Sequence, residues 1–363
     1  MDTDNVSIYY NMTRAYYELD NYDEAFASVT HALDLEPESI KCLSYRADIL
    51  FNKEEYDLAY KDYEKVLSNP IKSTNLGIAY YREAVCLFRL GDLSGSKIKI
   101  EKAITIKDDD DYRDFLDLLH KYEEVKREKS VTTLNLLGNA YGNVGWYKDA
   151  LKNHLKALEL LVDNDVLNFN VAFDYYKLAD YDNAKKYINY AIKLSYNPDY
   201  IAFKKLIIVR KKKETGEDSA QKEIALGKAY YDYGWTENAI DSFRRAIEYD
   251  PEDVTINDYI NICEMKKYCD HSDYESCDAQ EIMDLIMALY KKEMYYGCVN
   301  ECEKYIEKEE FQTKDKFYHY YGCALCHIEN YEKGVEMLKM AYQLNPDEGY
   351  LELITKYSEY LDN

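Results

Sequence analysis

Residues 131–164 read VTTLNLLGNAYGNVGWYKDALKNHLKALELLVDN. Apolar residues recur in this stretch at the three- and four-residue spacing of amphipathic helices. Two antiparallel helices can approach closely only where a small side chain on one leaves room for a large side chain opposite. Gly138 and Ala150 are expected to provide this room, and Tyr141 and Tyr147 to fill it. The stretch therefore predicts a hairpin of two packed helices.

A tyrosine followed three residues later by a small residue recurs along the chain. Two of the intervals between these small residues are 34, from Ala25 to Ala59 and from Ala150 to Ala184. A fixed period near this length is typical of stacked helical hairpins, because each hairpin buries its apolar face only against the next one. The six pairs are Tyr22/Ala25, Tyr56/Ala59, Tyr147/Ala150, Tyr181/Ala184, Tyr295/Cys298 and Tyr331/Gly334.

The small residues also show where the repeat is interrupted. With Ser96 and Ala239 added, successive intervals are 34, 37, 54, 34, 55, 59 and 36. Three intervals are too long by about the length of one helix with its turn. Amphipathic stripes at 112–122, 203–207 and 256–263 fill these three intervals, and a fourth at 350–357 closes the chain. We predict eight hairpins, four single helices and no strands, with all five prolines just after a hairpin's second helix.

This pattern resembles the tetratricopeptide repeat. Residues 131–164 match the family's pattern at Leu137, Gly138, Tyr141, Ala150 and Ala157, while His154 replaces an aromatic residue and Val162 a proline. The resemblance implies an all-α, right-handed α-solenoid of about eight hairpins, with extra single helices and a carboxy-terminal capping helix. The long intervals divide it into blocks 1–130, 131–219, 220–278 and 279–363. The architecture is used for binding many unrelated partners, so it predicts a non-enzymatic interaction scaffold.

Composition limits the kinds of partner and the cellular compartment that we expect for this chain. The formal net charge is −23 and the pI near 4.7, which argues against nucleic acid or an anionic membrane as the main partner. No secretory signal and no transmembrane-length apolar run is visible. Nine cysteines, an odd number, fit a reducing compartment better than a disulfide framework. We expect a cytoplasmic protein that binds a protein or peptide.

Basic and aromatic residues of the first three repeats are the first candidate site. They are expected on the first helices of their hairpins, which line the inner surface of a solenoid. Cationic side chains among aromatic rings on an acidic chain favour an acidic or carboxy-terminal peptide. The alternative is that the cations pair with nearby carboxylates. The candidates are Asn11, Arg14, Lys41, Tyr45, Arg82 and Arg89.

Asparagines of the fourth and fifth repeats are the second candidate site. Asn139 and Asn170 are 31 residues apart, and family members that clamp the carboxyl terminus of a chaperone peptide have two asparagines at this offset. Lys204 matches a basic position of that clamp, whereas Asn135 stands where the family has a lysine. An asparagine amide can donate to and accept from a peptide backbone. The alternative is that asparagine is simply common in this chain.

A cysteine-rich segment is the third candidate. Cys263, Cys269, His271 and Cys277 are residue types that zinc accepts, although their spacing differs from that of short zinc fingers. We expect residues 268–278 to form a loop between the third single helix and the seventh hairpin. No catalytic motif and no other cofactor site is visible. A competing hypothesis is therefore a sensor module whose solenoid changes shape when it binds a small peptide or a metal.

Overall fold

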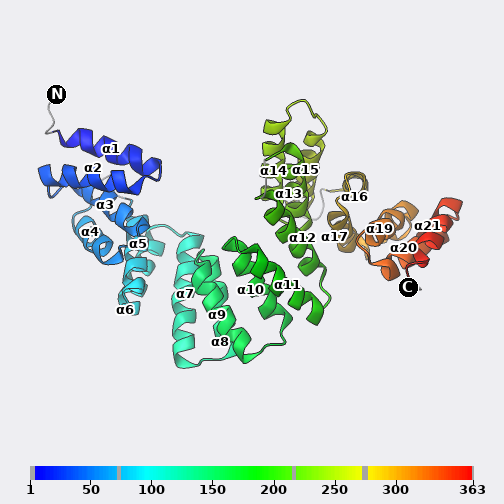
Figure 1. Ribbon diagram of the computed structural model, residues 1–363, viewed down its shortest axis with the longest axis horizontal. Helices are drawn as coiled ribbons and strands as arrows, with labels where there is room; N and C mark the ends of the chain where they lie inside the picture. Colours follow the sequence, from blue (N-terminus) through cyan, green and yellow to red (C-terminus); the bar gives the residue numbers. More distant parts are fainter. Residues whose placement is uncertain (1–4, 72–74, 215–217, 272–276, 362–363) are drawn as a thin grey trace. The chain divides into compact units, whose positions relative to one another are not determined.

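The computed structural model describes residues 5–71, 75–214, 218–271 and 277–361, and the side chain of His271 is not described. All regular secondary structure in these residues is helical (Figure 1). The chain divides into two compact units, Met1–Val162 and Asp163–Asn363. We call them the first and the second unit. The four blocks predicted from the long intervals remain a prediction, but the boundary expected at residue 130 lies inside the first unit.

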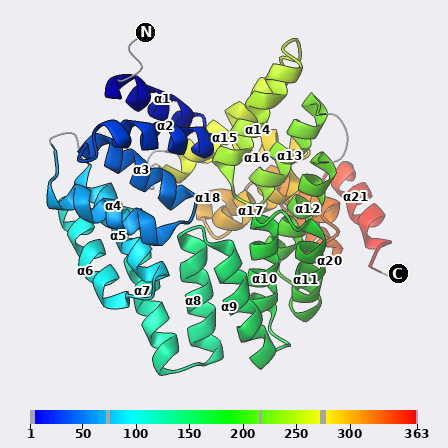
Figure 2. The ribbon, with the colours of Figure 1, turned by 60° about the vertical axis from the view of Figure 1, so that its left-hand side comes forward.

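The first unit contains four hairpins and one single helix. In each hairpin the two helices are antiparallel neighbours, and α7 lies beside the α8–α9 hairpin (Figure 2). The helices are α1 (Val6–Glu18), α2 (Tyr22–Leu35), α3 (Ile40–Asn52), α4 (Tyr56–Ser68), α5 (Leu76–Arg89), α6 (Leu93–Ile106), α7 (Asp110–Arg127), α8 (Val131–Asn143) and α9 (Tyr147–Leu160).

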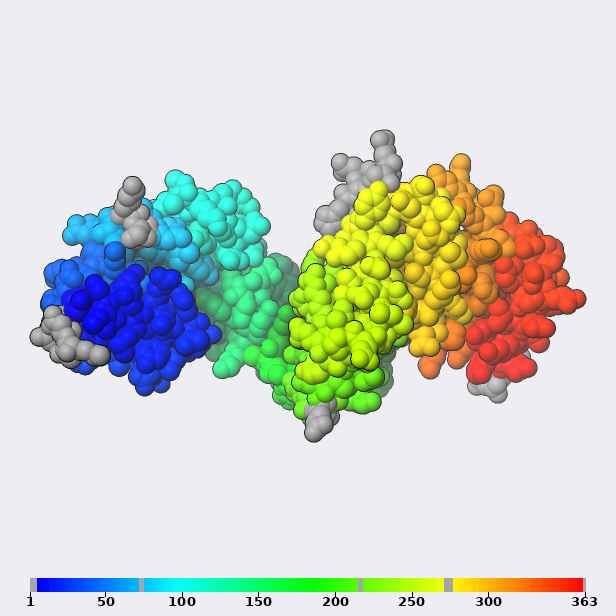
Figure 3. Space-filling view, turned by 90° about the horizontal axis from the view of Figure 1, so that it is seen from above, coloured from blue at the N-terminus to red at the C-terminus, as the bar shows by residue number. Residues whose placement is uncertain are grey.

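The second unit contains four hairpins, the single helices α12, α15 and α21, and the short α18. Segments that follow one another in the sequence lie next to one another, as its yellow, orange and red surfaces show (Figure 3). The helices are α10 (Asp165–Lys177), α11 (Tyr181–Leu194), α12 (Pro198–Lys213), α13 (Ala220–Asp232), α14 (Thr236–Tyr249), α15 (Ile256–His271), α16 (Ala279–Lys291), α17 (Tyr295–Tyr305), α18 (Glu309–Gln312), α19 (Asp315–His327), α20 (Tyr331–Leu344) and α21 (Glu348–Ser358).

The turn inside each hairpin contains one residue in the left-handed backbone conformation, five residues before the small residue. This conformation closes the first helix and starts the return of the chain. Because turn and small residue keep the same offset in all eight described hairpins, the predicted hairpins and their spacing are confirmed. The eight turn residues are Asp20, Glu54, Gly91, Gly145, Ala179, Gly234, Glu293 and Glu329.

Close packing inside a hairpin depends on a glycine, as expected, but the partner differs from the prediction. A methyl group on Gly138 would lie 2.3 Å from Nε2 of His154, so His154 of α9 fills the room that Gly138 leaves. At Gly138 the expected neighbours Tyr141 and Tyr147 are thus replaced by His154, whereas the filling of the room beside Ala150 stays a prediction. Gly227 and Phe243 make the equivalent contact between α13 and α14, which shows that His154 occupies an aromatic position of the repeat.

The single helices α7, α12, α15 and α21 lie where the long intervals placed them. In α7, Asp109 accepts a hydrogen bond from the backbone N–H of Asp111 and caps the helix. Its residues Phe115, Leu118 and Leu119 are fully buried in the core of the first unit. All five prolines lie two to four residues after the end of a hairpin's second helix, as predicted. The four-residue α18 was not predicted.

Candidate functional site

A groove in the first unit is lined by α1, α3 and α5, the first helices of three successive hairpins. Its cavity volume is about 420 Å³. Lys41 and Tyr45 lie one helical turn apart on α3, and Arg82 reaches the same groove from α5. Tyr10 lines it from α1. We call this cavity the N-terminal groove, and it contains three of the six residues predicted for this surface.

Tyrosine rings form the wall of the N-terminal groove. The Tyr45 ring packs edge-on against the rings of Tyr10 and Tyr17, with centroids 5.5 and 5.7 Å apart. Burial raises the pKa of Tyr45 above its ordinary value, so its hydroxyl is neutral at physiological pH. Side chains of this kind offer an apolar face and a polar tip to the same ligand.

The cations in the groove and beside it differ in how firmly the protein holds them. Arg82 forms an ion pair with Asp48 at 2.5 Å, and both side chains are about one-quarter exposed. Burial alone would lower the pKa of Arg82, but the Asp48 carboxylate raises it above its ordinary value. Arg14 pairs with Glu18 at 3.0 Å on the exposed face of α1. Lys41 is exposed. Arg82 is thus held inside the protein, whereas Arg14 and Lys41 face solvent.

The other three residues predicted for this surface, Arg14, Asn11 and Arg89, do not line the groove. Asn11 is exposed on α1. Arg89, at the end of α5, lies against the indole ring of Trp146 and donates a hydrogen bond to Asp149. Arg89 therefore connects α5 to the α8–α9 hairpin.

Sequence reasoning missed the acidic half of the groove. Glu18 and Asp48 line the groove with the cations, and Tyr63 donates a hydrogen bond from its hydroxyl to Asp48 at 2.6 Å. The signal for Asp48 was present, because a residue three positions after Tyr45 lies on the same face of a helix.

The predicted asparagine site is divided between the two units. Asn135 and Asn139 lie on α8 of the first unit, Asn170 on α10 and Lys204 on α12 of the second. The side-chain oxygen of Asn139 lies 3.1 Å from Nε2 of His154, within hydrogen-bond distance, so Asn139 contacts its own hairpin. Asn135, Asn170 and Lys204 are half-buried. The carboxylate clamp stays a prediction.

The described residues of the cysteine-rich segment line a pocket. Helix α15 continues to His271, so the expectation that the loop begins at residue 268 is wrong, and residues 272–276 lie outside the described residues. Cys269 and Cys277 line a cavity of about 330 Å³. Cys263 is fully buried in the core, six residues earlier on α15, which is roughly 9 Å of helix rise. The described residues contain no group of three or more His, Cys, Asp or Glu side chains placed to hold a metal ion.

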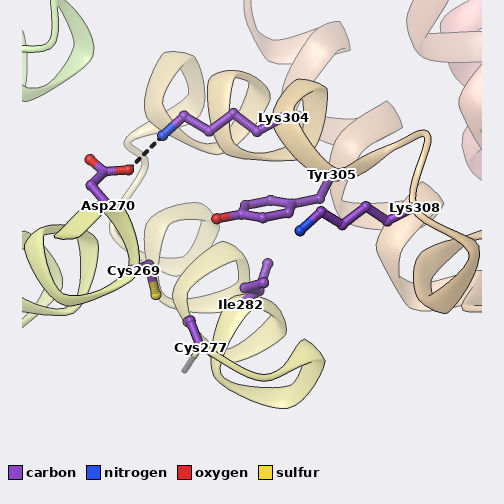
Figure 4. Close-up of a pocket in the computed structure, with 7 residues that line it drawn as sticks. All are labelled: Cys269, Asp270, Cys277, Ile282, Lys304, Tyr305 and Lys308. Carbon is purple, nitrogen blue, oxygen red and sulfur yellow. Dashed lines mark hydrogen bonds and ion pairs between the residues drawn. The ribbon is translucent and has the colours of Figure 1, made fainter. Parts of the chain in front are cut away.

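Lysines and an aromatic ring complete this thiol pocket (Figure 4). Lys304, Tyr305 and Lys308 reach in from one side, and Cys269, Cys277 and Ile282 from the other. The Lys304 ammonium donates to Asp270 at 2.8 Å. Burial raises the pKa of Cys277 to about 12 and also raises that of Cys269. Both side chains are thiols in the structure.

A chain of stacked helical hairpins with ligand-sized grooves belongs to the class of α-solenoid repeat proteins. The family model described as "Tetratricopeptide repeat" matches residues 6–39, which contain the α1–α2 hairpin, and residues 224–253, which contain most of the α13–α14 hairpin. The chain is thus similar to tetratricopeptide repeat proteins in these two segments. No curated protein sequence matches it. Among the described residues, no helix is long and apolar enough to cross a membrane.

Solved structures of tetratricopeptide repeat proteins resemble the chain at low identity. The P58(IPK) TPR domain is 15% identical over 98% of both chains, with a TM-score of 0.26. The TPR2AB domain of yeast Sti1, in a complex with pHSP90, is 17% identical over 72% of this chain and 97% of that chain, with a TM-score of 0.29. A Parabacteroides merdae repeat protein is 16% identical over 72% and 86%, with a TM-score of 0.27. Because these TM-scores are below 0.5, the classification rests on the repeat match and the hairpin geometry.

Proposed function

We propose that the chain is a non-enzymatic scaffold that binds an extended peptide segment of a partner protein in the N-terminal groove. The observation that carries this proposal is the convergence of Lys41, Tyr45 and Arg82, from two successive hairpins, on one cavity of about 420 Å³. Ligand pockets commonly have volumes of about 300–1,000 Å³. The tyrosine rings offer apolar contact, and their hydroxyls and the ionic groups offer polar contacts to a peptide.

The groove favours a peptide that presents a carboxylate, either from an acidic side chain or from its carboxyl terminus. Lys41 is exposed, and the Arg14 ion pair with Glu18 is about 60% exposed on both sides. A surface pair this exposed is weak, so a ligand carboxylate can replace Glu18 at little cost. Arg82 has a fixed role, because it neutralises Asp48 and so prevents that carboxylate from repelling the ligand. We also propose a cytoplasmic location, which nine reduced cysteines support.

A charge-reversal experiment tests the groove. The probe is a fluorescein-labelled octapeptide of alternating glutamate and leucine with a free carboxyl terminus, and its affinity is measured by fluorescence anisotropy at physiological salt. Arg14→Glu/Lys41→Glu should weaken binding at least about tenfold, which corresponds to about 1.4 kcal/mol.

The matched control is Lys129→Glu/Lys152→Glu, which makes the same change in net charge at two exposed positions of the first unit outside the groove. We expect it to change affinity less than about twofold, because exposed charges more than a Debye length away are screened. Equal weakening by the two double variants would show that net charge, and not the groove, governs binding. No weakening by either would exclude the groove as the site.

A further inference from the structure

Two of the nine cysteines differ from the others in exposure. Cys269 and Cys277 are partly exposed, whereas the other seven thiols are buried. A reagent in solution reaches partly exposed thiols before buried ones. The two accessible thiols of this chain are therefore the first that a soluble oxidant meets.

These two thiols also line the same pocket. Cys269 lies near the end of α15, and Cys277 directly precedes Asp278, the residue that caps α16. Both line the thiol pocket (Figure 4), and each influences the pKa of the other. A disulfide between them would join the third single helix to the seventh hairpin. Two thiols that line the same pocket need less backbone movement to form this bond than thiols in separate parts of the fold.

Among the residues that line the pocket, ammonium groups outnumber carboxylates, in contrast to the chain as a whole. Lys304 and Lys308 line it with Asp270 as the one acidic lining residue. Lys304 pairs with Asp270, and the Lys308 ammonium lies 5.1 Å from the centre of the Tyr305 ring. On a chain of net charge −23, a local excess of ammonium groups attracts small molecules that carry carboxylates.

We propose that Cys269 and Cys277 form a dithiol modification site, which a small peptide disulfide bearing carboxylates oxidises to an intramolecular disulfide. Glutathione disulfide is the representative of this chemical class. The pocket lies in the second unit, so this inference does not depend on peptide binding in the N-terminal groove.

The reaction is two successive thiol–disulfide exchanges. The Cys269 thiolate attacks one sulfur of the small disulfide, the sulfur–sulfur bond breaks, and one small thiolate leaves and takes up a proton. The Cys277 thiol then loses its proton and attacks Sγ of Cys269, and the second small thiolate leaves. The protein loses two electrons and two protons, and the small disulfide gains them as two thiols.

The order of the two cysteines follows from their surroundings. Burial raises the pKa of both thiols, but the Cys277 side chain favours the Cys269 thiolate and so lowers the pKa of Cys269. The carboxylates of Asp270, Glu281 and Glu301 disfavour the Cys269 thiolate, and Glu281 also disfavours the Cys277 thiolate. Lys304 of α17 forms ion pairs with Asp270 and Glu301 and so offsets their charge. Cys269 is therefore the attacking residue, and the rate should rise about tenfold per pH unit between pH 7 and 9.

The test uses the reduced full-length chain under native conditions with millimolar glutathione disulfide. Remaining thiols are alkylated after an acid quench, and peptides are mapped by mass spectrometry. We expect a peptide in which Cys269 and Cys277 are linked. Cys277→Ser should stop the reaction at a glutathione adduct on Cys269. Cys263→Ala, on the same helix, should form the linked peptide at the wild-type rate.

A second comparison tests the lysines. Lys304→Gln/Lys308→Gln should slow the reaction with glutathione disulfide at least about threefold and leave the reaction with neutral bis(2-hydroxyethyl) disulfide unchanged. Equal slowing with both reagents would refute the attraction of carboxylates. The dithiol site itself would be refuted if glutathione adducts formed on the buried cysteines before they formed on Cys269. It would also be refuted if no linked peptide formed under conditions in which the urea-unfolded chain reacts.

Discussion

The guanidinium group of Arg89 lies 3.7 Å from the centre of the Trp146 indole ring. Arg89 also donates to Asp149 at 2.9 Å, and its side chain is about one-quarter exposed. One residue at the end of α5 thus holds the α8–α9 hairpin across the intervening α6 and α7.

We predict that Arg89→Met destabilises the first unit by about 1–3 kcal/mol, because it removes a partly desolvated cation–π contact and an ion pair while keeping the apolar stem. The chain has two tryptophans, Trp146 in the first unit and Trp235 in the second. Urea unfolding in a Trp235→Phe background follows the first unit through Trp146.

The same substitution in a Trp146→Phe background serves as the control, because Trp235 then reports the second unit. We expect Arg89→Met to leave the urea midpoint of the second unit unchanged. A first-unit midpoint identical to that of the unsubstituted chain would show that the Arg89 contact contributes nothing to stability.

Substitution by alanine should change the stability of the first unit in opposite directions at two glycines of α8. A methyl group on Gly138 would clash with the His154 ring, whereas one on Gly142 would meet nothing within 4 Å. We predict that Gly138→Ala costs about 1–3 kcal/mol through overpacking, and that Gly142→Ala stabilises by about 0.5–1 kcal/mol through helix propensity. Urea unfolding followed through Trp146 measures both, and equal signs would contradict the packing found in this hairpin.

Helix α7 is predicted to be an essential part of the first unit's core. Phe115 is fully buried, and its ring contacts Tyr81, Phe88 and Trp146. Phe115→Ala should therefore cost about 3–5 kcal/mol. Asp117→Ala, at an exposed position of the same helix, should change stability by less than about 0.5 kcal/mol. If both substitutions leave the Trp146 transition unchanged, α7 does not contribute to this core.

The hairpins could be predicted because their signals repeat at fixed offsets. The small residue follows the turn by five positions in every described hairpin, and each proline follows a second helix. The contact between Gly138 and His154 was not predicted, because a nearby tyrosine has a suitable size to fill the same space. Only the rotation of α9 about its axis decides that His154 lies there. Helix α18 was missed because four residues are too few to show a period.

The candidate sites could be predicted in part. Lys41, Tyr45 and Arg82 share a groove because equivalent positions of successive first helices face the same side. The pairing of Arg82 with Asp48 could not be read from composition, because it depends on side-chain reach between α5 and α3. The shared pocket of Cys269 and Cys277 depends on how α15 and α16 meet, for which the sequence has no periodic signal.

A buried carboxylate should make the stability of the second unit depend on pH. Asp232 is almost fully buried, where it accepts from Lys205 at 2.7 Å and from the backbone N–H of Gly297 at 3.2 Å. Burial raises the pKa of Asp232 above its ordinary value, although both partners oppose the shift. The folded chain therefore binds a proton in a pH range where the unfolded chain is already ionised. The stabilisation linked to this proton is complete below about pH 3.9 and is lost as the pH rises through the folded pKa.

We predict that the free energy of unfolding of the unsubstituted chain, minus that of Asp232→Asn, falls as the pH rises from about 4 to 7. Lys205→Met should cost about 3–5 kcal/mol at pH 7, because it leaves a buried charge without its cation. Urea unfolding followed through Trp235 in a Trp146→Phe background measures both. Asp241→Asn, an exposed carboxylate on α14, is the matched control and should give a nearly flat difference. A difference for Asp232→Asn that rises with pH would mean that pairing with Lys205 outweighs burial, and that the folded pKa of Asp232 lies below its ordinary value.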